Sequence, residues 1–209
     1  GIIVNALYKN INWNIVSTIG FDMDGTLYDE YDFIKQVYCE INTKLINNNN
    51  ILDFMLMRWL EKGSSYPYIF NEAYDMWKKN IDYKDDFINS ALDIFRNYNP
   101  SLSLTNRNRD LLEYYKNKYS LFLISDGNYH LQQKKYNALG LSDFFEIHNV
   151  VFTGKYSSEY HKPNIKSLSL ISVDVKEAVF FGDRGNDINF ALASSMQFQK
   201  VYNMTEIPL

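Results

Sequence analysis

Hydrophobic residues follow two different spacings along the chain. Residues 15–21 form a short apolar run that predicts a buried strand, preceded by an amphipathic lead-in at residues 2–10. Between residues 29 and 104 no strand is indicated, and an apolar residue recurs every four positions, as on one face of a helix ending near Asn47. The recurring residues are Phe33, Val37, Ile41 and Leu45. Three further helices are predicted in this stretch, at residues 52–62, 68–79 and 84–97.

From residue 105 onward, helices and strands alternate. The predicted helices span residues 107–119, 129–139 and 188–193. The predicted strands span residues 121–125, 146–152, 179–181 and 200–202. Alternation of this kind is typical of a parallel, doubly wound α/β sheet. We therefore expect a Rossmann-like α/β core formed by residues 1–28 and 105–209, and a smaller, all-helical domain at residues 29–104.

Two carboxylates follow the first predicted strand. Asp22 and Asp24 are two residues apart in an extended segment, so their side chains should leave on the same face, and Gly25 lets the backbone turn behind them. Acids held this close repel each other unless one is protonated or a cation binds. Oxygen ligands of this kind suit Mg²⁺. A strand-end Asp can also be a turn or cap residue, so the pair alone leaves both interpretations open.

Three more polar segments could complete such a site. They are Ser125-Asp126-Gly127-Asn128, His161-Lys162-Pro163-Asn164 and Gly182-Asp183-Arg184-Gly185-Asn186-Asp187. Two of them follow predicted strands, and ligands of parallel sheets bind beyond the carboxyl ends of the strands. Taken singly, Asp183 could cap a helix, Lys162 could be a solvated loop residue and Ser125 could close a turn. Their order along the chain favours a shared site.

These segments resemble the four motifs of the haloacid dehalogenase superfamily, in its phosphatase branch. The stretch Asp22-Met23-Asp24-Gly25-Thr26-Leu27 resembles the first motif, Ser125 the hydroxyl of the second, Lys162 the amine of the third, and residues 182–187 the acidic fourth. The resemblance extends from Phe21 to Asp187. Asp126 is a departure, because the family often has Asn there. The helical stretch at residues 29–104 lies where the family inserts its cap domain.

The resemblance implies a mechanism. Asp22 would attack phosphorus to form an aspartyl phosphate, and Asp24 would act first as acid and then as base, for which a raised pKa is expected. Mg²⁺ would be held by Asp22, the backbone carbonyl of Asp24 and Asp183, with Asp187 supporting the site from one helical turn further on.

The resemblance also implies how the substrate is bound. Ser125 and Lys162 would hold the oxygens of the transferred phosphoryl group, with Asp126 and Gly127 beside them. His161 is predicted from its position next to Lys162, and not from the resemblance, to contact the substrate. The cap domain would close over the site and select among small molecules.

Composition narrows the possible partners. The 209 residues are 46% hydrophobic and carry a formal net charge of -4, without the basic cluster that binds nucleic acid or an anionic membrane surface. No apolar run reaches the about 18 residues of a membrane span, and no secretory leader is recognisable, so we expect a cytoplasmic enzyme. The single cysteine, Cys39, excludes an intrachain disulfide and is predicted to be a packed thiol without a role.

Three functions remain open from the sequence. The first is Mg²⁺-dependent hydrolysis of a small phosphomonoester, such as a sugar phosphate, a nucleotide or a phosphorylated acid. The second is phosphoryl transfer within a sugar, as in the mutases of the same superfamily. The third is a non-catalytic phospho-switch or binding protein, because response-regulator receivers also combine acids, a hydroxyl and a lysine on a parallel sheet. The sequence leaves the oligomeric state undecided.

Overall fold

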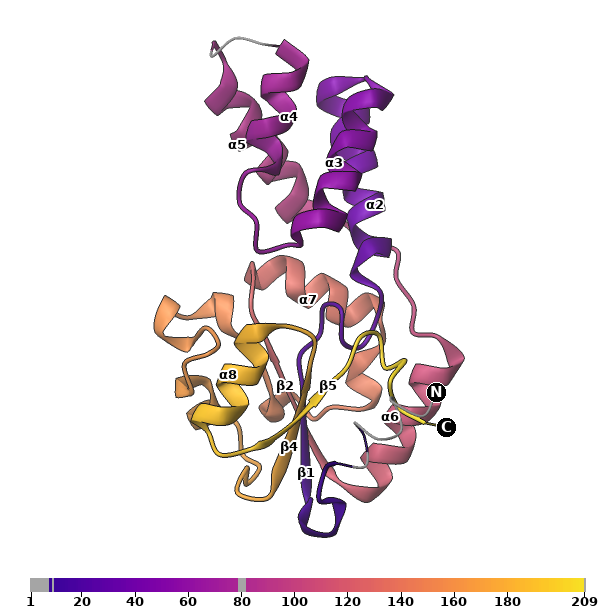
Figure 1. Cartoon of the computed structure of the whole chain (residues 1–209), viewed down its shortest axis with the longest axis vertical. Coiled ribbons are helices and arrows are strands. Elements are labelled where there is room, and N and C mark those ends of the chain that lie inside the picture. Colours follow the sequence, from indigo (N-terminus) through magenta and orange to yellow (C-terminus); the bar gives the residue numbers. More distant parts are fainter. Residues whose placement is uncertain (1–7, 9, 79–81, 209) are drawn as a thin grey trace. The chain divides into compact units, whose positions relative to one another are not determined.

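A computed structural model describes residues 8, 10–78 and 82–208 of the chain. The chain forms two compact units, one of Gly1–Glu30 with Ser101–Leu209 and one of Tyr31–Pro100 (Figure 1). The first contains a β-sheet with flanking helices, and the second is built from helices. The lead-in predicted at residues 2–10 lies outside the described residues, apart from Tyr8 and Asn10.

The first unit is organised around a five-stranded sheet. Its strands are β1 (Thr18–Phe21), β2 (Ser120–Ser125), β3 (Val150–Phe152), β4 (Ala178–Gly182) and β5 (Gln197–Lys200). They lie in the order β3-β2-β1-β4-β5, and every neighbouring pair is parallel. The central strand β1 is buried along its whole length, as expected when helices cover both faces of a sheet. The predicted parallel α/β fold is confirmed.

Helices cover both faces of this sheet (Figure 1). The helices of this unit are α6 (Asn106–Lys118), α7 (Tyr129–Ala138) and α8 (Gly185–Ala193). On one face, Phe180 packs against Phe190 of α8, with ring centroids 5.0 Å apart. On the other face, Phe181 packs against Tyr115 of α6 at 5.8 Å. Because successive strand residues point to opposite faces, an uninterrupted apolar run suits a strand that is buried on both sides.

A glycine in the central strand makes room for large rings on its neighbours. Gly20 is flanked by Phe122 of β2 and Phe180 of β4, and a Cβ at Gly20 would lie 2.2 Å from the Phe122 ring. The two rings, whose centroids are 6.0 Å apart, occupy this space instead. Because the three central strands are parallel, their carboxyl ends meet at one edge of the sheet.

The second unit is a set of helices. It contains α2 (Glu30–Ile41) from its second residue onward, a π-helical segment (Asn42–Ile46), α3 (Asn49–Lys62), α4 (Ile69–Lys78) and α5 (Lys84–Asn97). The predicted apolar stripe faces inward, because Phe33, Val37 and Ile41 are fully buried. Asn47 ends the π-helical segment with a left-handed φ of 54°, and Asn48 caps α3 by accepting two backbone N–H bonds. Within the described residues, each helix is too short or too polar to span a membrane.

Three details differ from the sequence prediction. The strand expected at residues 146–152 is confined to Val150–Phe152, because Ile147–Asn149 form a 3-10 turn. The last strand lies at Gln197–Lys200 rather than 200–202, because its pairing with β4 begins directly after the turn that follows α8. Cys39 is exposed, not packed. It lies two positions after Val37, about 200° around the helix, and so faces away from the apolar stripe.

Candidate active site

The turn after β1 carries the two acids of the first segment. Asp22 is tied to the sheet, because its N–H donates to the carbonyl of Phe181 on β4 at 2.9 Å. The chain then turns at Gly25, which has a left-handed φ of 74°. A Cβ at Gly25 would lie 2.3 Å from Oδ2 of Asp183. Glycine at this position therefore allows both the turn and the close approach of Asp183.

Lys162 joins two of the acids. Its Nζ donates to Oδ1 of Asp22 at 2.9 Å and to Oδ1 of Asp187 at 2.8 Å, and its side chain is only 3% exposed. Burial acts to lower the pKa of the Lys162 ammonium, but the charges of Asp22 and Asp187 outweigh burial and raise that pKa. The lysine therefore stays charged inside a buried acidic cluster.

Asp22, Asp183 and Asp187 form a group that could hold a cation, with one oxygen of each within 4.8 Å of the others. Burial, and then the charge of Asp22, raises the pKa of Asp183 to about 8. Burial likewise raises the pKa of Asp22, although Lys162 opposes it. Ionising several carboxyl groups this close together is unfavourable unless a cation offsets their charge. Their oxygen atoms are suitable ligands for a hard divalent ion such as Mg²⁺. Lys162 binds Oδ1 of Asp22, and the carboxyl group of Asp183 is within hydrogen-bond reach of Asp22, so these two acids are close enough to share a cation.

Asp187 is held from two sides. Its Oδ1 accepts the bond from Lys162, and its Oδ2 accepts from the backbone N–H groups of Asp183 at 3.2 Å and Arg184 at 3.1 Å. It lies in the first turn of α8, where the helix dipole favours a negative charge. With both oxygens engaged, Asp187 fixes Lys162 and the backbone at Asp183.

The Asp24 side chain points to a different set of partners. Its Oδ1 accepts from the Tyr28 hydroxyl and from Nζ of Lys135, the latter at 3.0 Å, and its Oδ2 accepts from Nε2 of Gln132 at 2.7 Å. Burial acts to raise the pKa of Asp24, but the Lys135 charge and these hydrogen bonds outweigh it, so the pKa is lowered. The raised pKa expected from the sequence is therefore wrong for this state, because a buried cation accompanies the carboxylate.

The second polar segment, residues 125–128, is hydrogen-bonded to α7 and to the segment that carries Lys162. Ser125 is buried at the end of β2, and its Oγ accepts from Nε2 of Gln132 at 2.8 Å. Asp126 accepts from Thr153 Oγ1 at 2.6 Å and from the backbone N–H of Lys162 at 3.4 Å. The carboxylate of Asp126 thus anchors the Lys162 segment to β2, and its charge adds to the raised pKa of Lys162. Gly127 follows with a φ of 111°.

The structure brings most of the predicted side chains together and adds others that sequence reasoning missed. His161 is half-buried next to Lys162, and its contact with a substrate stays a prediction. The missed residues whose side chains bond to the predicted ones include Tyr28, Gln132, Lys135 and Thr153. The sequence offers one indication of them: Gln132 and Lys135 are three residues apart on the helix that follows Ser125, and so lie on the same side of it.

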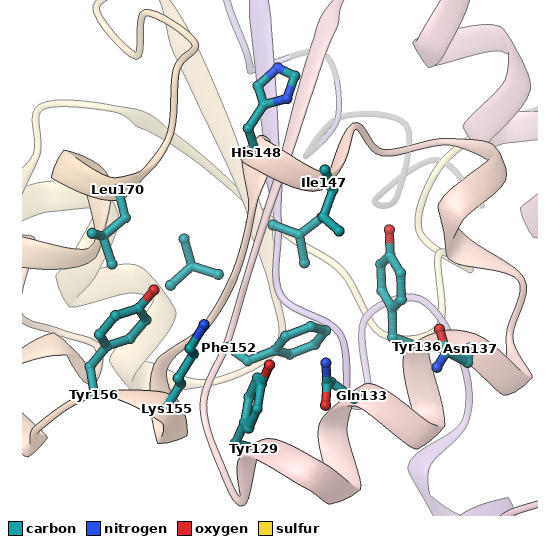
Figure 2. Close-up of a pocket in the computed structure, with 12 residues that line it drawn as sticks. Tyr129, Gln133, Tyr136, Asn137, Ile147, His148, Phe152, Lys155, Tyr156 and Leu170 are labelled. Atoms are coloured by element: carbon teal, nitrogen blue, oxygen red, sulfur yellow. The ribbon is translucent and has the colours of Figure 1, made fainter.

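A separate cavity of about 370 Å³ is lined by residues of α7, of β3 and of the segments on either side of β3. Figure 2 shows Tyr129 and Tyr136 on α7 near Phe152 of β3, and the rings of Tyr136 and Phe152 have centroids 5.6 Å apart. The crossover from β3 to β4, described throughout, contains only short 3-10 turns, and its residues Lys155, Tyr156 and Leu170 line the cavity. Its described lining includes none of the predicted acids, so it is distinct from the acidic site.

Comparison with known proteins gives both a family and relatives. The family model of haloacid dehalogenase-like hydrolases matches residues 16–194. A glyceraldehyde 3-phosphate phosphatase from Pyrococcus furiosus is 26% identical over 179 residues, which cover 81% of this chain and 73% of that protein.

Solved structures share the fold. A candidate HAD hydrolase from Bacillus subtilis, YfnB, which was crystallised with magnesium, has a TM-score of 0.63 at 16% identity, covering 88% of this chain and 85% of that one. A candidate β-phosphoglucomutase from Thermotoga maritima has a TM-score of 0.59 at 17% identity, covering 88% and 84%. At these identities the similarity shows the fold alone.

Proposed function

The chain belongs to the haloacid dehalogenase-like hydrolases, and we propose that within this family it is a phosphatase that hydrolyses a small phosphomonoester through an aspartyl phosphate. The observation that carries this proposal is the environment of Asp22. Its buried carboxylate lies against the ammonium of Lys162, at 2.9 Å, and in one cluster with Asp183. A nucleophilic carboxylate beside a fixed cation is suited to attack an anionic substrate, because the cation offsets the repulsion between them.

The reaction would proceed in two displacements. In the first, Asp24 enters in its protonated form: an oxygen of Asp22 bonds to phosphorus, the ester P–O bond breaks, and the leaving oxygen takes the proton of Asp24. In the second, water gives a proton to Asp24 as its oxygen bonds to phosphorus, and the bond between phosphorus and Asp22 breaks. Inorganic phosphate and the alcohol are the products, and Asp22 is restored.

The remaining residues would bind and orient. Asp22, the backbone carbonyl of Asp24 and Asp183 would hold Mg²⁺, which when bound supplies positive charge beside the phosphoryl oxygens. Ser125 would donate its hydroxyl to one phosphoryl oxygen, and Lys162 would direct its ammonium to another. Asp126 and Gly127 would shape this end of the site, since Asp126 already anchors the backbone of Lys162.

Two observations support the proposed substrate class: the name of a relative and the net charge of the chain. A relative at 26% identity carries the name of a phosphatase for a phosphorylated triose, which supports a small phosphorylated sugar, with nucleotides and phosphorylated acids as the other members of the class. The net charge of -4 without a basic cluster argues against nucleic acid as a partner. We assign residues 29–104 the part of a cap domain that selects the substrate, as the family resemblance implies.

A panel of phosphate esters, assayed with and without Mg²⁺, tests this function. We expect Mg²⁺-dependent release of inorganic phosphate that is lost in Asp22→Asn and retained in Asp110→Asn, an exposed acid of α6. An Asp22→Asn protein with normal turnover would falsify the nucleophile assignment. Isomerised sugar phosphate without free phosphate would indicate a mutase instead. Stable uptake of one phosphoryl group without turnover would indicate a phospho-switch.

A further inference from the structure

The carboxylate of Asp24 is held by side chains that belong to none of the sequence motifs. Among the described residues, three donors meet it: Tyr28 and Lys135 at Oδ1, and Gln132 at Oδ2. The two carboxylate oxygens offer about four lone-pair positions, so these contacts leave one position, on Oδ2, where Asp24 would carry the proton that it passes to the leaving oxygen. Because the side chain is 15% exposed, part of the carboxylate stays accessible to a ligand.

Lys135 is a costly residue to bury. Its side chain is 4% exposed, and a buried ammonium is unfavourable unless it is paired and hydrogen-bonded. The ion pair with Asp24, at 3.0 Å, offsets this cost. An apolar side chain of similar volume would often be as stable or more stable here if α7 served only to cover the sheet. The charge at this position therefore points to a role at Asp24 beyond packing.

Gln132 links Asp24 to the end of the neighbouring strand. Its Nε2 lies 2.7 Å from Oδ2 of Asp24 and 2.8 Å from Oγ of Ser125. A single amide therefore holds the carboxylate that would carry the proton next to the hydroxyl that would bind the phosphoryl group. Lys135 follows Gln132 by three residues, so both project from the same side of α7.

We propose, on the basis of the phosphatase function above, that Lys135 and Gln132 are positioning residues that hold the Asp24 carboxylate in register with the leaving oxygen and the attacking water. As the ester P–O bond breaks, its electron pair goes to the leaving oxygen, which takes the proton from Asp24. Misplacing such a donor by about 1 Å can cost about 10²-fold in rate. A leaving group that is stable as an anion needs no proton and should depend little on these residues.

Lys135→Met tests this dependence on the leaving group. We would measure kcat/KM with Mg²⁺ for an alkyl phosphate, whose leaving oxygen needs a proton, and for p-nitrophenyl phosphate, whose leaving oxygen does not. We expect the alkyl phosphate value to fall about 10²-fold and the p-nitrophenyl phosphate value to change little. Lys134→Met, at the neighbouring position of α7, is the matched control and should leave both values unchanged.

The outcomes separate positioning from folding. An equal loss with both esters would assign Lys135 to stability or phosphate binding and overturn the proposal. A wild-type protein that releases phosphate from no ester of the panel would overturn the phosphatase function, and this role of Lys135 with it.

A second pair of variants decides the matter if Lys135→Met fails to fold. Gln132→Met keeps the ion pair between Lys135 and Asp24, so no buried charge is left unpaired. It should lower kcat/KM more for the alkyl phosphate than for p-nitrophenyl phosphate, on top of a rise in KM common to both esters because Ser125 loses its partner. Gln133→Met is its control. Equal losses with both esters in Gln132→Met would likewise overturn the proposal.

Discussion

The Lys162 ammonium lies 2.9 Å from Oδ1 of Asp22, and both side chains are almost fully buried. Lys162→Met would leave the Asp22 charge unpaired in a buried site. We expect the free energy of unfolding to fall by about 3–5 kcal/mol, as measured by urea denaturation. We expect phosphate release to fall at least about 10²-fold, because a donor to the phosphoryl group is lost.

An exposed ion pair provides the control for Lys162. Lys166 pairs with Glu159 at 2.7 Å, but both side chains are more than half exposed, and solvent screens such pairs. Lys166→Met should therefore change the unfolding free energy by only about 0–1 kcal/mol. Equal destabilisation by the two substitutions would contradict a special role for the buried pair.

The fold was largely predictable because its central elements are buried on both faces. Such strands appear as continuous apolar runs, and the helices between them carry regular apolar stripes. The prediction was wrong where pairing or solvent exposure decides the structure. The residue types at 147–149 are compatible with a longer strand, but only Val150–Phe152 pair with β2. Cys39 lies in an apolar context along the sequence but on the outer side of its helix.

The site was predictable where its residues follow strands and not where they lie on α7. An acid after an apolar run is visible in the sequence, because parallel strands end at one edge. The inward side of α7 mixes apolar residues with buried polar ones, Leu131 with Gln132 and Lys135. Apolar periodicity cannot identify such a face. A lysine in a helix is normally predicted to be exposed, so the burial of Lys135 is not predictable until its partner Asp24 is known.

Gly25→Ala should disturb metal binding through a single methyl group. The new Cβ would lie 2.3 Å from Oδ2 of Asp183, so Asp183 must move. Gly63→Ala is a matched control, because Gly63 has a similar φ of 76° with nothing within 4 Å of a Cβ. Both should lose about 1 kcal/mol or somewhat more of stability from backbone strain. Only Gly25→Ala should weaken Mg²⁺ binding, measured by calorimetry; equal affinities would contradict a metal ligand at Asp183.

Asp126 should act mainly as a hydrogen-bond acceptor. Its Oδ1 receives bonds from Thr153 and from the backbone of Lys162, and an amide oxygen can accept both. Asp126→Asn should therefore retain most activity, whereas Asp126→Ala should lose about tenfold, because the Lys162 segment loses its anchor. Steady-state kinetics of both variants would check this. If Asn is as damaging as Ala, the charge of Asp126 matters more than its position.

Mg²⁺ binding should depend steeply on pH because of Asp183. In the metal-free protein the pKa of Asp183 is raised to about 8, first by burial and then by Asp22. Below that pH the carboxyl group holds a proton that a bound cation must displace, so the apparent affinity should rise about tenfold per pH unit up to pH 8 and level off above it. Calorimetry in buffers of different ionisation enthalpy would count the protons released.

Stability of the metal-free protein should follow the opposite trend over the same range. A carboxyl group with a raised pKa binds more protons in the folded than in the unfolded state, so its contribution to stability is lost as pH rises from its ordinary value to about 8. For one group the slope is about 1.4 kcal/mol per pH unit. Saturating Mg²⁺ should reduce or reverse this trend, because the ion stabilises the ionised form that high pH produces. A metal-free protein whose stability is constant between pH 5 and pH 8 would show that Asp183 titrates normally, and the affinity for Mg²⁺ should then also be independent of pH in that range.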